Sequence, residues 1–351
     1  MEKNKIKILK KVITTQEGTS RIMKRILITG ACGSIGRKLV TELLKKNNKV
    51  CAFDNNEDGL FILSSELRKN FPNTFKVFIG DIRDKERVMQ AMSGIDEVYH
   101  CAALKHVELS EYNPFEAIKT NINGTQNIID CAIQSKVCKV LVTSSDKAVN
   151  PSSMMGSSKL LAEKIAVSAN NFSGTDSISF GCVRFGNVWD TNGSVGRIFK
   201  SQVQNKQDLT VTSTEMTRFF ILIEDAISLC INSMEEMIGG EIFISDMGAI
   251  SIGELACAFT EGSHSSNILE MGLKPGEKLY EELFTDVESF RTYLFKDMYV
   301  VLPDNLDKDS TRLEKLYEKY TNPLPSNTPL RSDSKIAKEI DPNMLVDRIM
   351  K

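Results

Sequence analysis

The segment "TSSDKAVNPSSMMGSSK", residues 143–159, holds the residue types best suited to chemistry, and it directly follows the apolar run "CKVLV". Ser145, Asp146 and Lys147 stand side by side in it. Adjacent residues that leave a strand end can both face one substrate if the backbone turns, so this acid and base suit proton transfers at neighbouring carbon atoms. The competing interpretation is a helix N-cap followed by a surface lysine, because Ser and Asp cap helices well.

Two further residues of this segment share one helical face. Lys159 follows Met155 by four residues, which is about one helical turn, so both side chains point the same way. A lysine can bind or donate, whereas a thioether cannot transfer a proton. Met155 therefore raises the question of which group would handle a proton at that position.

A glycine-rich turn precedes this segment in the chain. The sequence "ITGACGSIGRKL" places Gly30, Gly33 and Gly36 at G-x-x-G-x-x-G spacing, between a β-branched run and an amphipathic helical pattern. Missing side chains let a pyrophosphate approach the helix N-terminus, where free N–H groups and the helix dipole favour anions. The turn, including Ser34 and Ile35, is therefore predicted to bind a dinucleotide; a plain glycine-rich turn is the alternative.

Acidic residues end the next two strand-like runs. Asp54 closes "KVCAFD", where a carboxylate can bind a ribose 2′-hydroxyl and repels a 2′-phosphate, so NAD is favoured over NADP. Asp81 and Ile82 lie in "GDIRD", which predicts either an adenine-contacting edge or a solvated turn. Ala102 and Ala103 follow the fourth run and complete the predicted cofactor-binding set.

The elements that must position these residues alternate along the first half of the chain. Short β-branched runs such as "KRILITG", "FKVFIGD" and "EVYHCAA" alternate with longer helical patterns. This alternation predicts an α/β fold of the Rossmann type, a doubly wound parallel sheet with helices on both faces. Ligands of such sheets bind beyond the carboxyl ends of the strands, where the residues named above fall.

From about residue 186 the pattern becomes loop-rich and polar. We therefore predict an N-terminal arm over residues 1–22, an NAD-binding domain over 23–186, a smaller interleaved substrate-binding region over 187–325, and a loosely packed tail over 326–351. The strand-like run "GEIFISD", residues 240–246, is expected to rejoin the main sheet.

Composition excludes several classes of function. A net charge of −2 disfavours a nucleic-acid partner, and no apolar run approaches the roughly 20 residues that span a bilayer. The eight cysteines include no C-x-x-C pair and form no ligand spacing with the three histidines, so we expect no metal site. Scattered thiols in apolar runs and the absence of a signal-peptide pattern favour the cytoplasm.

The motifs together resemble a known family. The chain resembles an extended short-chain dehydrogenase/reductase and, more narrowly, the nucleotide-sugar 4,6-dehydratases of polysaccharide biosynthesis, the UDP-N-acetylglucosamine dehydratase group. The resemblance spans about residues 23–285 and rests on "HCAALKHVELSEYNPFEAIKTNINGTQN", "SSDKAVNP", "VRFGNV", "GSV", "EMTRFF" and "PGEKLYEEL" in that order.

The resemblance implies a reaction. Hydride transfer from carbon 4 of the hexose to bound NAD makes a ketone and acidifies the proton on carbon 5. By resemblance, Lys147 removes this proton, Asp146 protonates the leaving hydroxyl on carbon 6, and Ser145 hydrogen-bonds the 4-hydroxyl. Lys147 must be neutral for this step, which calls for a pKa lowered by burial or by a nearby cation such as Lys159.

The resemblance also implies roles for the positions of Met155 and Lys159. These enzymes usually have Tyr and Lys at this spacing, and the lysine binds the nicotinamide ribose. Lys159 matches the pattern and Met155 departs from it, which indicates either a protein that binds without catalysis or a subgroup in which Lys147 or a water handles the 4-hydroxyl proton. Because Asp146, Lys147 and Lys159 are all present, we favour an active lyase.

Substrate contacts are implied for residues elsewhere in the chain, with a surface loop as the alternative for the first two. By resemblance these are Lys105 and His106 in the loop after the fourth strand-like run, and Asn121 as a helix-internal polar group near the active site. Arg184, Asn187, Arg218, Glu277 and Lys278 fit a pocket for a sugar diphosphate, whose two charges call for cationic donors.

Three functional readings stay open. They are a UDP-N-acetylglucosamine 4,6-dehydratase, a related enzyme that also epimerises carbon 5 or acts on another nucleotide sugar such as a GDP-linked one, and a non-catalytic NAD-binding sensor. Helical patterns over residues 114–134 and 156–171 carry apolar faces, including Ile118, Ile122, Ile129, Ala162 and Ile165, that predict a homo-oligomer; burial against the chain's own sheet is the alternative.

Overall fold

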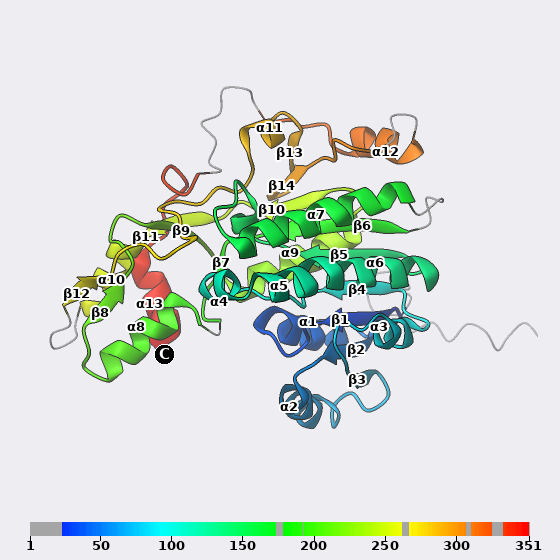
Figure 1. The fold of residues 1–351 in the computed structure, drawn as a ribbon, viewed down its shortest axis with the longest axis horizontal. Coiled ribbons are helices and arrows are strands. Elements are labelled where there is room, and N and C mark those ends of the chain that lie inside the picture. Colours follow the sequence, from blue (N-terminus) through cyan, green and yellow to red (C-terminus); the bar gives the residue numbers. More distant parts are fainter. Residues whose placement is uncertain are drawn as a thin grey trace, which may run out of the picture.

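A computed structural model describes residues 23–172, 178–191, 193–261, 267–306, 310–324 and 333–350. The predicted N-terminal arm lies outside these residues. Within them the chain forms a body built on one large sheet and a smaller lobe beside it, seen at the left of Figure 1. The two parts meet at the carboxyl ends of the central strands.

The large sheet has nine strands in the order β13-β14-β10-β6-β5-β4-β1-β2-β3 within the described ranges. Its strands are β1 (Arg25–Thr29), β2 (Lys49–Asp54), β3 (Phe75–Ile79), β4 (Glu97–His100), β5 (Lys139–Thr143), β6 (Ser179–Arg184), β10 (Ile242–Ser245), β13 (Thr292–Phe295) and β14 (Met298–Val301). Seven strands run parallel from β3 to β10, and β14 and β13 add an antiparallel edge. The predicted doubly wound α/β fold is confirmed.

Helices cover both faces of this sheet (Figure 1). They are α1 (Ser34–Lys45), α2 (Glu57–Leu67), α3 (Lys85–Met92), α4 (Val107–Tyr112), α5 (Pro114–Ala117), the π-helical turn η1 (Ile118–Asn123), α6 (Gly124–Gln134), the 3₁₀ turn η2 (Asp146–Ala148), α7 (Met154–Phe172), α9 (Ile223–Glu236), α11 (Asp286–Ser289) and α12 (Thr311–Lys319). Helix α1 packs beside α9, whereas α3, α6 and α7 pack side by side. Because helices cover both faces, the central strands β1, β5 and β6 are buried from their second residue to their last.

The run over residues 240–246 forms β10 and pairs in parallel with β6, as expected for a strand that rejoins the sheet. The order of the sheet reverses between β1 and β4. At such a switch point the loops that follow neighbouring strands diverge and leave a crevice, which is where ligands of these folds bind.

The smaller lobe surrounds a second hydrophobic cluster. It consists of β7 (Asn187–Val188), α8 (Val195–Gln204), β8 (Leu209–Val211), β9 (Thr217–Ile221), β11 (Gly248–Ser251), α10 (Ile252–Thr260), β12 (Ile268–Glu270) and α13 (Pro342–Met350). Its core includes Trp189, Phe199, Leu255 and Phe259. Trp189 is buried among these side chains, so it packs the lobe.

The expectation of a loosely packed tail is wrong for the described part of residues 326–351. Helix α13 packs against α8 and α10, and its Leu345 and Ile349 are buried in the second cluster. The indole Nε1 of Trp189 donates to the carbonyl of Leu345 over 3.1 Å. The amphipathic period of a short helix was present in the sequence, but only the lobe supplies the surface that covers it.

Among the described residues, no helix is long and apolar enough to cross a bilayer.

Candidate active site

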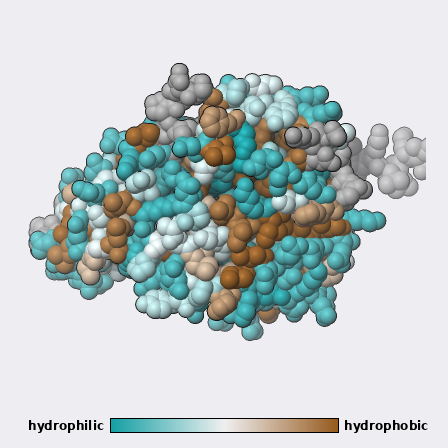
Figure 2. All heavy atoms as spheres, turned by 45° about the horizontal axis from the view of Figure 1, so that its top comes forward, coloured by the Kyte–Doolittle hydropathy of each residue, from teal (hydrophilic) through white to brown (hydrophobic). Residues whose placement is uncertain are grey.

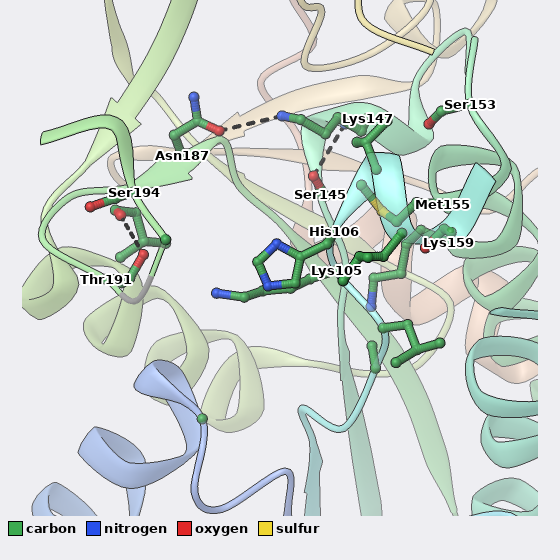
Figure 3. Close-up of a pocket in the computed structure, with 18 of the residues that line it drawn as sticks. Lys105, His106, Ser145, Lys147, Ser153, Met155, Lys159, Asn187, Thr191 and Ser194 are labelled. Atoms are coloured by element: carbon green, nitrogen blue, oxygen red, sulfur yellow. Dashed lines mark hydrogen bonds between the residues drawn. The ribbon is translucent and has the colours of Figure 1, made fainter. Parts of the chain in front are cut away.

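A cavity of about 1350 Å³ opens at the carboxyl ends of the central strands, between the sheet and the smaller lobe. Figure 3 shows part of it, with side chains from the loops after β4 and β5, from α7 and from the lobe facing one another. Its volume exceeds that of an ordinary single-ligand pocket, so two ligands can lie in it together. One end is lined by the glycine-rich turn and the other by residues of the lobe.

The glycine-rich turn has the shape that the sequence predicted. Gly30 adopts a φ of +67°, and a Cβ there would lie 2.6 Å from the backbone nitrogen of Ala102. A Cβ on Gly36 would lie 2.2 Å from the carbonyl oxygen of Gly30. Gly33 and Ser34 begin α1 without a side-chain cap and line the cavity together with Ile35. The first N–H groups of α1 are thus presented toward the cavity, as a pyrophosphate requires.

Asp54 is held in a fixed orientation at the end of β2. One carboxylate oxygen accepts a hydrogen bond from the backbone N–H of Cys32 and the other from that of Asn56, each over 2.9 Å. Burial, together with the nearby Asp54 carboxylate, raises the pKa of the Cys32 thiol to about 12. Asp54 lines the cavity, so its negative charge lies within reach of a ligand in the glycine-rich turn.

The remaining predicted cofactor residues also line the cavity. Asp81 pairs with Arg83 over 2.6 Å, and this hydrogen bond lowers the pKa of the carboxyl group. Ile82 is buried, while Ala102 and Ala103 form the wall after β4. All these positions border the same end of the cavity as Asp54.

The segment after β5 forms a turn that brings three polar side chains together. The hydroxyl of Ser145 donates to Oδ1 of Asp146 over 2.8 Å, and the ammonium of Lys147 donates to the same oxygen over 2.9 Å. Lys147 also donates to Oδ1 of Asn187 over 3.3 Å (Figure 3). Ser145 does cap η2, as the competing interpretation held, but Lys147 faces the cavity and is not a surface lysine.

Asp146 does not itself line the cavity. Its side chain is fully buried, and its Oδ2 has no hydrogen-bond partner among the described residues. Ser145 and Lys147 both border the cavity and both contact Oδ1. A proton can therefore move between Asp146 and the cavity through either neighbour.

The predicted lowering of the Lys147 pKa is wrong. Burial alone lowers the pKa of this ammonium, and Arg218 acts in the same direction, but the carboxylates of Asp146 and Glu281 outweigh both. The pKa of Lys147 lies above its ordinary value as a result. Lys159, which we had expected to lower it, donates instead to the carbonyl of Thr143 over 2.7 Å.

Met155 and Lys159 lie on one face of α7 and both line the cavity, as their spacing predicted. Burial lowers the pKa of the Lys159 ammonium. The thioether of Met155 is buried against the cavity wall and offers no transferable proton. Lys159 is thus placed to donate a hydrogen bond to a ligand that lies along α7.

Lys105 and His106 follow β4 and border the cavity, with both side chains in its centre in Figure 3. Asn121 is the helix-internal polar group that was predicted, but it is buried behind this loop and does not line the cavity, so a direct substrate contact finds no support. Its amide accepts from the N–H of Leu104 over 2.8 Å and donates to the carbonyl of Leu104 over 3.0 Å and to Ser158 over 2.8 Å. Asn121 therefore fixes the Lys105 loop instead of contacting substrate.

The structure does not support the predicted substrate contact of Arg184. Its guanidinium is 1% exposed, pairs with Glu163 over 2.7 Å and with Glu288 over 3.1 Å, and donates to the carbonyl of Leu283. It does not line the cavity, so the predicted diphosphate contact finds no support. The residues next to Arg184 in the sequence do not indicate that its partners are Glu163 on α7 and Glu288 on α11.

The other predicted substrate residues do border the lobe end of the cavity. Arg218 is nearly buried and donates to the carbonyls of Lys278 and Leu279, which ties β9 to this loop. The ammonium of Lys278 donates to the carbonyl of Val149 over 2.7 Å, and Glu277 accepts from the N–H of Lys274. Asn187 lines the cavity beside Lys147.

Sequence reasoning missed Glu281. Its carboxylate lines the cavity and lies 3.6 Å from the ammonium of Lys147 and 3.5 Å from that of Lys278. Nothing in "EKLYEEL" distinguishes Glu281 from the adjacent Glu282, whose side chain accepts from Asn150 instead. The spacing of three residues between Lys278 and Glu281 was the one available signal.

The sequence pattern of the polysaccharide biosynthesis protein family matches residues 26–303. The chain belongs to this family. The matched span includes both ends of the cavity described above, and it ends before the segment that carries Ser334 and α13.

Relatives of this family member are similar over most of their length. The inverting UDP-N-acetylglucosamine 4,6-dehydratase of Campylobacter jejuni is 41% identical over 82% of this chain and 86% of its own. A protein named UDP-glucose 4-epimerase from Rickettsia massiliae is 35% identical over 81% of this chain and 84% of its own. The X-ray structure of Pen from Bacillus thuringiensis superposes with a TM-score of 0.83 at 37% identity, covering 93% of this chain and 97% of that one.

Proposed function

We propose that this family member is a nucleotide-sugar 4,6-dehydratase that converts UDP-N-acetylglucosamine to a 4-keto-6-deoxy sugar with bound NAD, for surface glycan or nonulosonic acid biosynthesis. The observation that carries the proposal is the group at the end of β5. Ser145 and Lys147 face the cavity, share one oxygen of the buried Asp146, and line the same cavity as Lys159 on α7. The similarity to the Campylobacter dehydratase supports the same assignment.

The cofactor end of the cavity fits NAD. The backbone of the glycine-rich turn leaves no space for side chains where the pyrophosphate would approach, and the Asp54 carboxylate suits two ribose hydroxyls better than a phosphate. Lys159 would bind the nicotinamide ribose. When bound, the nicotinamide supplies hydride acceptance from carbon 4 and hydride return to carbon 6, so no cofactor is consumed.

The first proton to be handled is that of the 4-hydroxyl, which is released as carbon 4 is oxidised. Met155 cannot take it. Ser145 can, because its hydroxyl already donates to Asp146: a proton that arrives at Ser145 Oγ lets the one on it pass to Asp146 Oδ1. Asp146 is thereby protonated before the elimination begins.

The elimination then uses the two partners of Asp146. A neutral Lys147 removes the proton of carbon 5, and Asp146 returns its proton through Ser145 to the hydroxyl leaving carbon 6. Lys147 afterwards gives its proton back to carbon 5. The 4-hydroxyl proton leaves in the water, so proton transfers balance without a tyrosine.

The lobe end of the cavity would hold the nucleotide diphosphate. Arg218 and Lys278 present cationic groups on adjacent segments, and Lys105 and His106 line the same cavity. Cationic donors of this kind suit the two phosphate charges of a nucleotide sugar.

Incubation of the purified protein with UDP-N-acetylglucosamine in deuterated water, followed by NMR of the product, tests the proposal. We expect a 6-deoxy-4-keto sugar with deuterium at carbon 5, and its couplings report which face was reprotonated. Parallel incubations with UDP-glucose and a GDP-hexose separate the alternatives. Change at carbon 4 alone would support a 4-epimerase, as in the Rickettsia relative, and no turnover of any sugar would leave a binding protein.

We further propose that the protein acts as a homo-oligomer in the cytoplasm. Leu109, Tyr112, Phe115 and Leu161 on α4, α5 and α7 are 61%, 81%, 74% and 49% exposed. Figure 2 shows apolar side chains among hydrophilic ones on the face turned toward the viewer. All eight cysteines are free, in keeping with a reducing compartment.

The residues that the sequence predicted at a subunit interface are less exposed than these four. Ile129 and Ala162 are buried within the chain, and Ile118, Ile122 and Ile165 are half-buried, so burial against the chain itself accounts for the first two. Light scattering of the wild-type protein and of Phe115→Lys tests the interface, since the charged variant should dissociate toward monomer.

A further inference from the structure

Glu281 occupies an unusual position for a carboxylate. It is 2% exposed, yet it lines the cavity, and its Oε2 has no hydrogen-bond partner among the described residues. Its Oε1 lies 3.6 Å from the ammonium of Lys147. The Oε2 atom lies 3.5 Å from the ammonium of Lys278 without a hydrogen bond to it, and burying a carboxylate in this state is costly unless another group uses it. The neighbours of Glu281 indicate which group that is.

The backbone of Glu281 is fixed by a segment beyond the matched family span. Its N–H donates to the hydroxyl of Ser334 over 2.9 Å, and the N–H of Ser334 donates back to the carbonyl of Glu281 over 2.9 Å. The Ser334 hydroxyl also lies 2.7 Å from that of Thr217 on β9. Two other segments of the chain thus hold the backbone of Glu281 in the position from which its side chain faces Lys147.

The charges that face this pair come from every element around it. Asp146 on η2 lies 2.9 Å from the ammonium of Lys147, Lys278 lies 3.5 Å from the carboxylate of Glu281, and Arg218 on β9 acts on Lys147 as a further positive charge. Two carboxylates and three cations therefore lie close together, and all of them except Asp146 line the cavity. Such an arrangement can shift a proton between neighbours without changing its total charge.

The charge of Lys147 before the reaction sets a further requirement. Lys147 begins as an ammonium held by two carboxylates, but it must be a free amine to remove the proton of carbon 5. Asp146 cannot take that proton, because it receives the proton of the 4-hydroxyl. A second acceptor beside Lys147 is required.

We propose that Glu281 is this acceptor: it stores the proton of Lys147 during the elimination and returns it afterwards. The inference rests on the proposed dehydratase function. As the 4-hydroxyl proton neutralises Asp146, the N–H bond of Lys147 breaks and an O–H bond forms on Glu281 Oε1. Lys147 then takes the carbon 5 proton, gives it back to carbon 5, and regains its own from Glu281, so every proton is accounted for. Glu281 acts through Lys147 and is a positioning residue.

The test compares Glu281→Gln and Glu281→Asp with wild type, and Glu282→Gln serves as the matched control on the same segment. Turnover is followed by NMR, the KM for the nucleotide sugar is measured beside kcat, and deuterium wash-in at carbon 5 is recorded separately. We expect Glu281→Gln to lower kcat and carbon 5 exchange by about a hundredfold with KM changed less than about threefold. Glu282→Gln should behave as wild type.

The order of the two Glu281 variants separates proton storage from packing. Asp keeps a carboxylate but is shorter, whereas Gln keeps the shape and loses the proton site. Proton storage predicts that Asp retains more activity than Gln, while a packing role predicts the reverse and would overturn the proposal. If Glu281→Gln is too unstable to assay, Ser334→Ala loosens the same carboxylate and should lower kcat while leaving KM unchanged.

The pH profile gives a further distinction. In Glu281→Gln the proton acceptor beside Lys147 is missing, so Lys147 must lose its proton to solvent. The kcat of this variant should therefore rise with pH. If Glu281 merely keeps Lys147 charged, its removal lowers the Lys147 pKa and raises activity at neutral pH, which would refute the inference. Failure of the wild type to form any 6-deoxy-4-keto sugar refutes the proposed function instead, so the two failures are distinguishable.

Discussion

Replacing Arg184 with methionine separates a structural role from the predicted diphosphate contact. The guanidinium is enclosed by Glu163, Glu288 and the carbonyl of Leu283, and these partners raise the pKa of Arg184 further despite its burial. Arg184→Met leaves two buried carboxylates without a cation. Breaking a buried ion pair in this way destabilises proteins by about 3–5 kcal/mol.

This destabilisation converts to a measurable change in melting temperature. Unfolding entropies of about 2.1 cal/mol/K per residue, taken over this chain, give a decrease in Tm of about 4–7 °C. The assay is thermal and denaturant unfolding of the protein beside the KM for the nucleotide sugar. We expect the lower Tm with an unchanged KM.

Two controls sharpen the comparison. Arg197→Met removes an arginine that is about half exposed and pairs with Asp190 over 2.8 Å, so it should change stability by less than about 1 kcal/mol. Adding Glu163→Gln and Glu288→Gln to Arg184→Met removes the unpaired charges and should restore much of the lost stability. A tenfold rise in KM at unchanged Tm would show that Arg184 contacts substrate and that the structural assignment is wrong.

Four other predictions follow from the site. Lys147→Ala should abolish turnover while NAD stays bound, measured by NMR and by cofactor content; surviving activity would exclude Lys147 as the base. Met155→Leu should keep kcat within about threefold, because this near-isosteric change removes no proton-transferring group, and a larger loss would give the thioether a role. Asp54→Asn should weaken NAD binding about tenfold and improve NADP binding, by titration calorimetry, since it removes a charge-assisted hydrogen bond; unchanged selectivity would contradict the assignment of Asp54. Burial lowers the pKa of His100 from 6.5 to about 3, so the unfolded chain binds a proton there that the folded chain excludes, and unfolding free energy should fall by up to about 1.4 kcal/mol per pH unit from pH 6.5 toward pH 3. A His100→Gln variant should lose that part of the slope in unfolding experiments, and an identical slope would refute it.

The sequence alone was sufficient where chemistry depends on neighbours along the chain. The glycine spacing and Asp54 form a turn and a strand end whose geometry is set by a few consecutive residues, and the structure reproduces both. Ser145, Asp146 and Lys147 stay together for the same reason, and Met155 and Lys159 share a face because a helix repeats every 3.6 residues. The parallel sheet likewise follows from the alternation of elements.

Only the tertiary structure decided the residues whose partners come from elsewhere. Arg184 was predicted to bind phosphate, but the structure places it between glutamates of α7 and α11. Asn121 is the polar group inside a helix that was predicted, but it bonds to Leu104 behind the cavity wall instead of contacting substrate. The pKa of Lys147 is raised by its sequence neighbour Asp146 and, in addition, by Glu281, which is far away in the sequence. Long-range electrostatics and burial depend on which surfaces meet, and no local pattern encodes which of two adjacent glutamates will face the cavity.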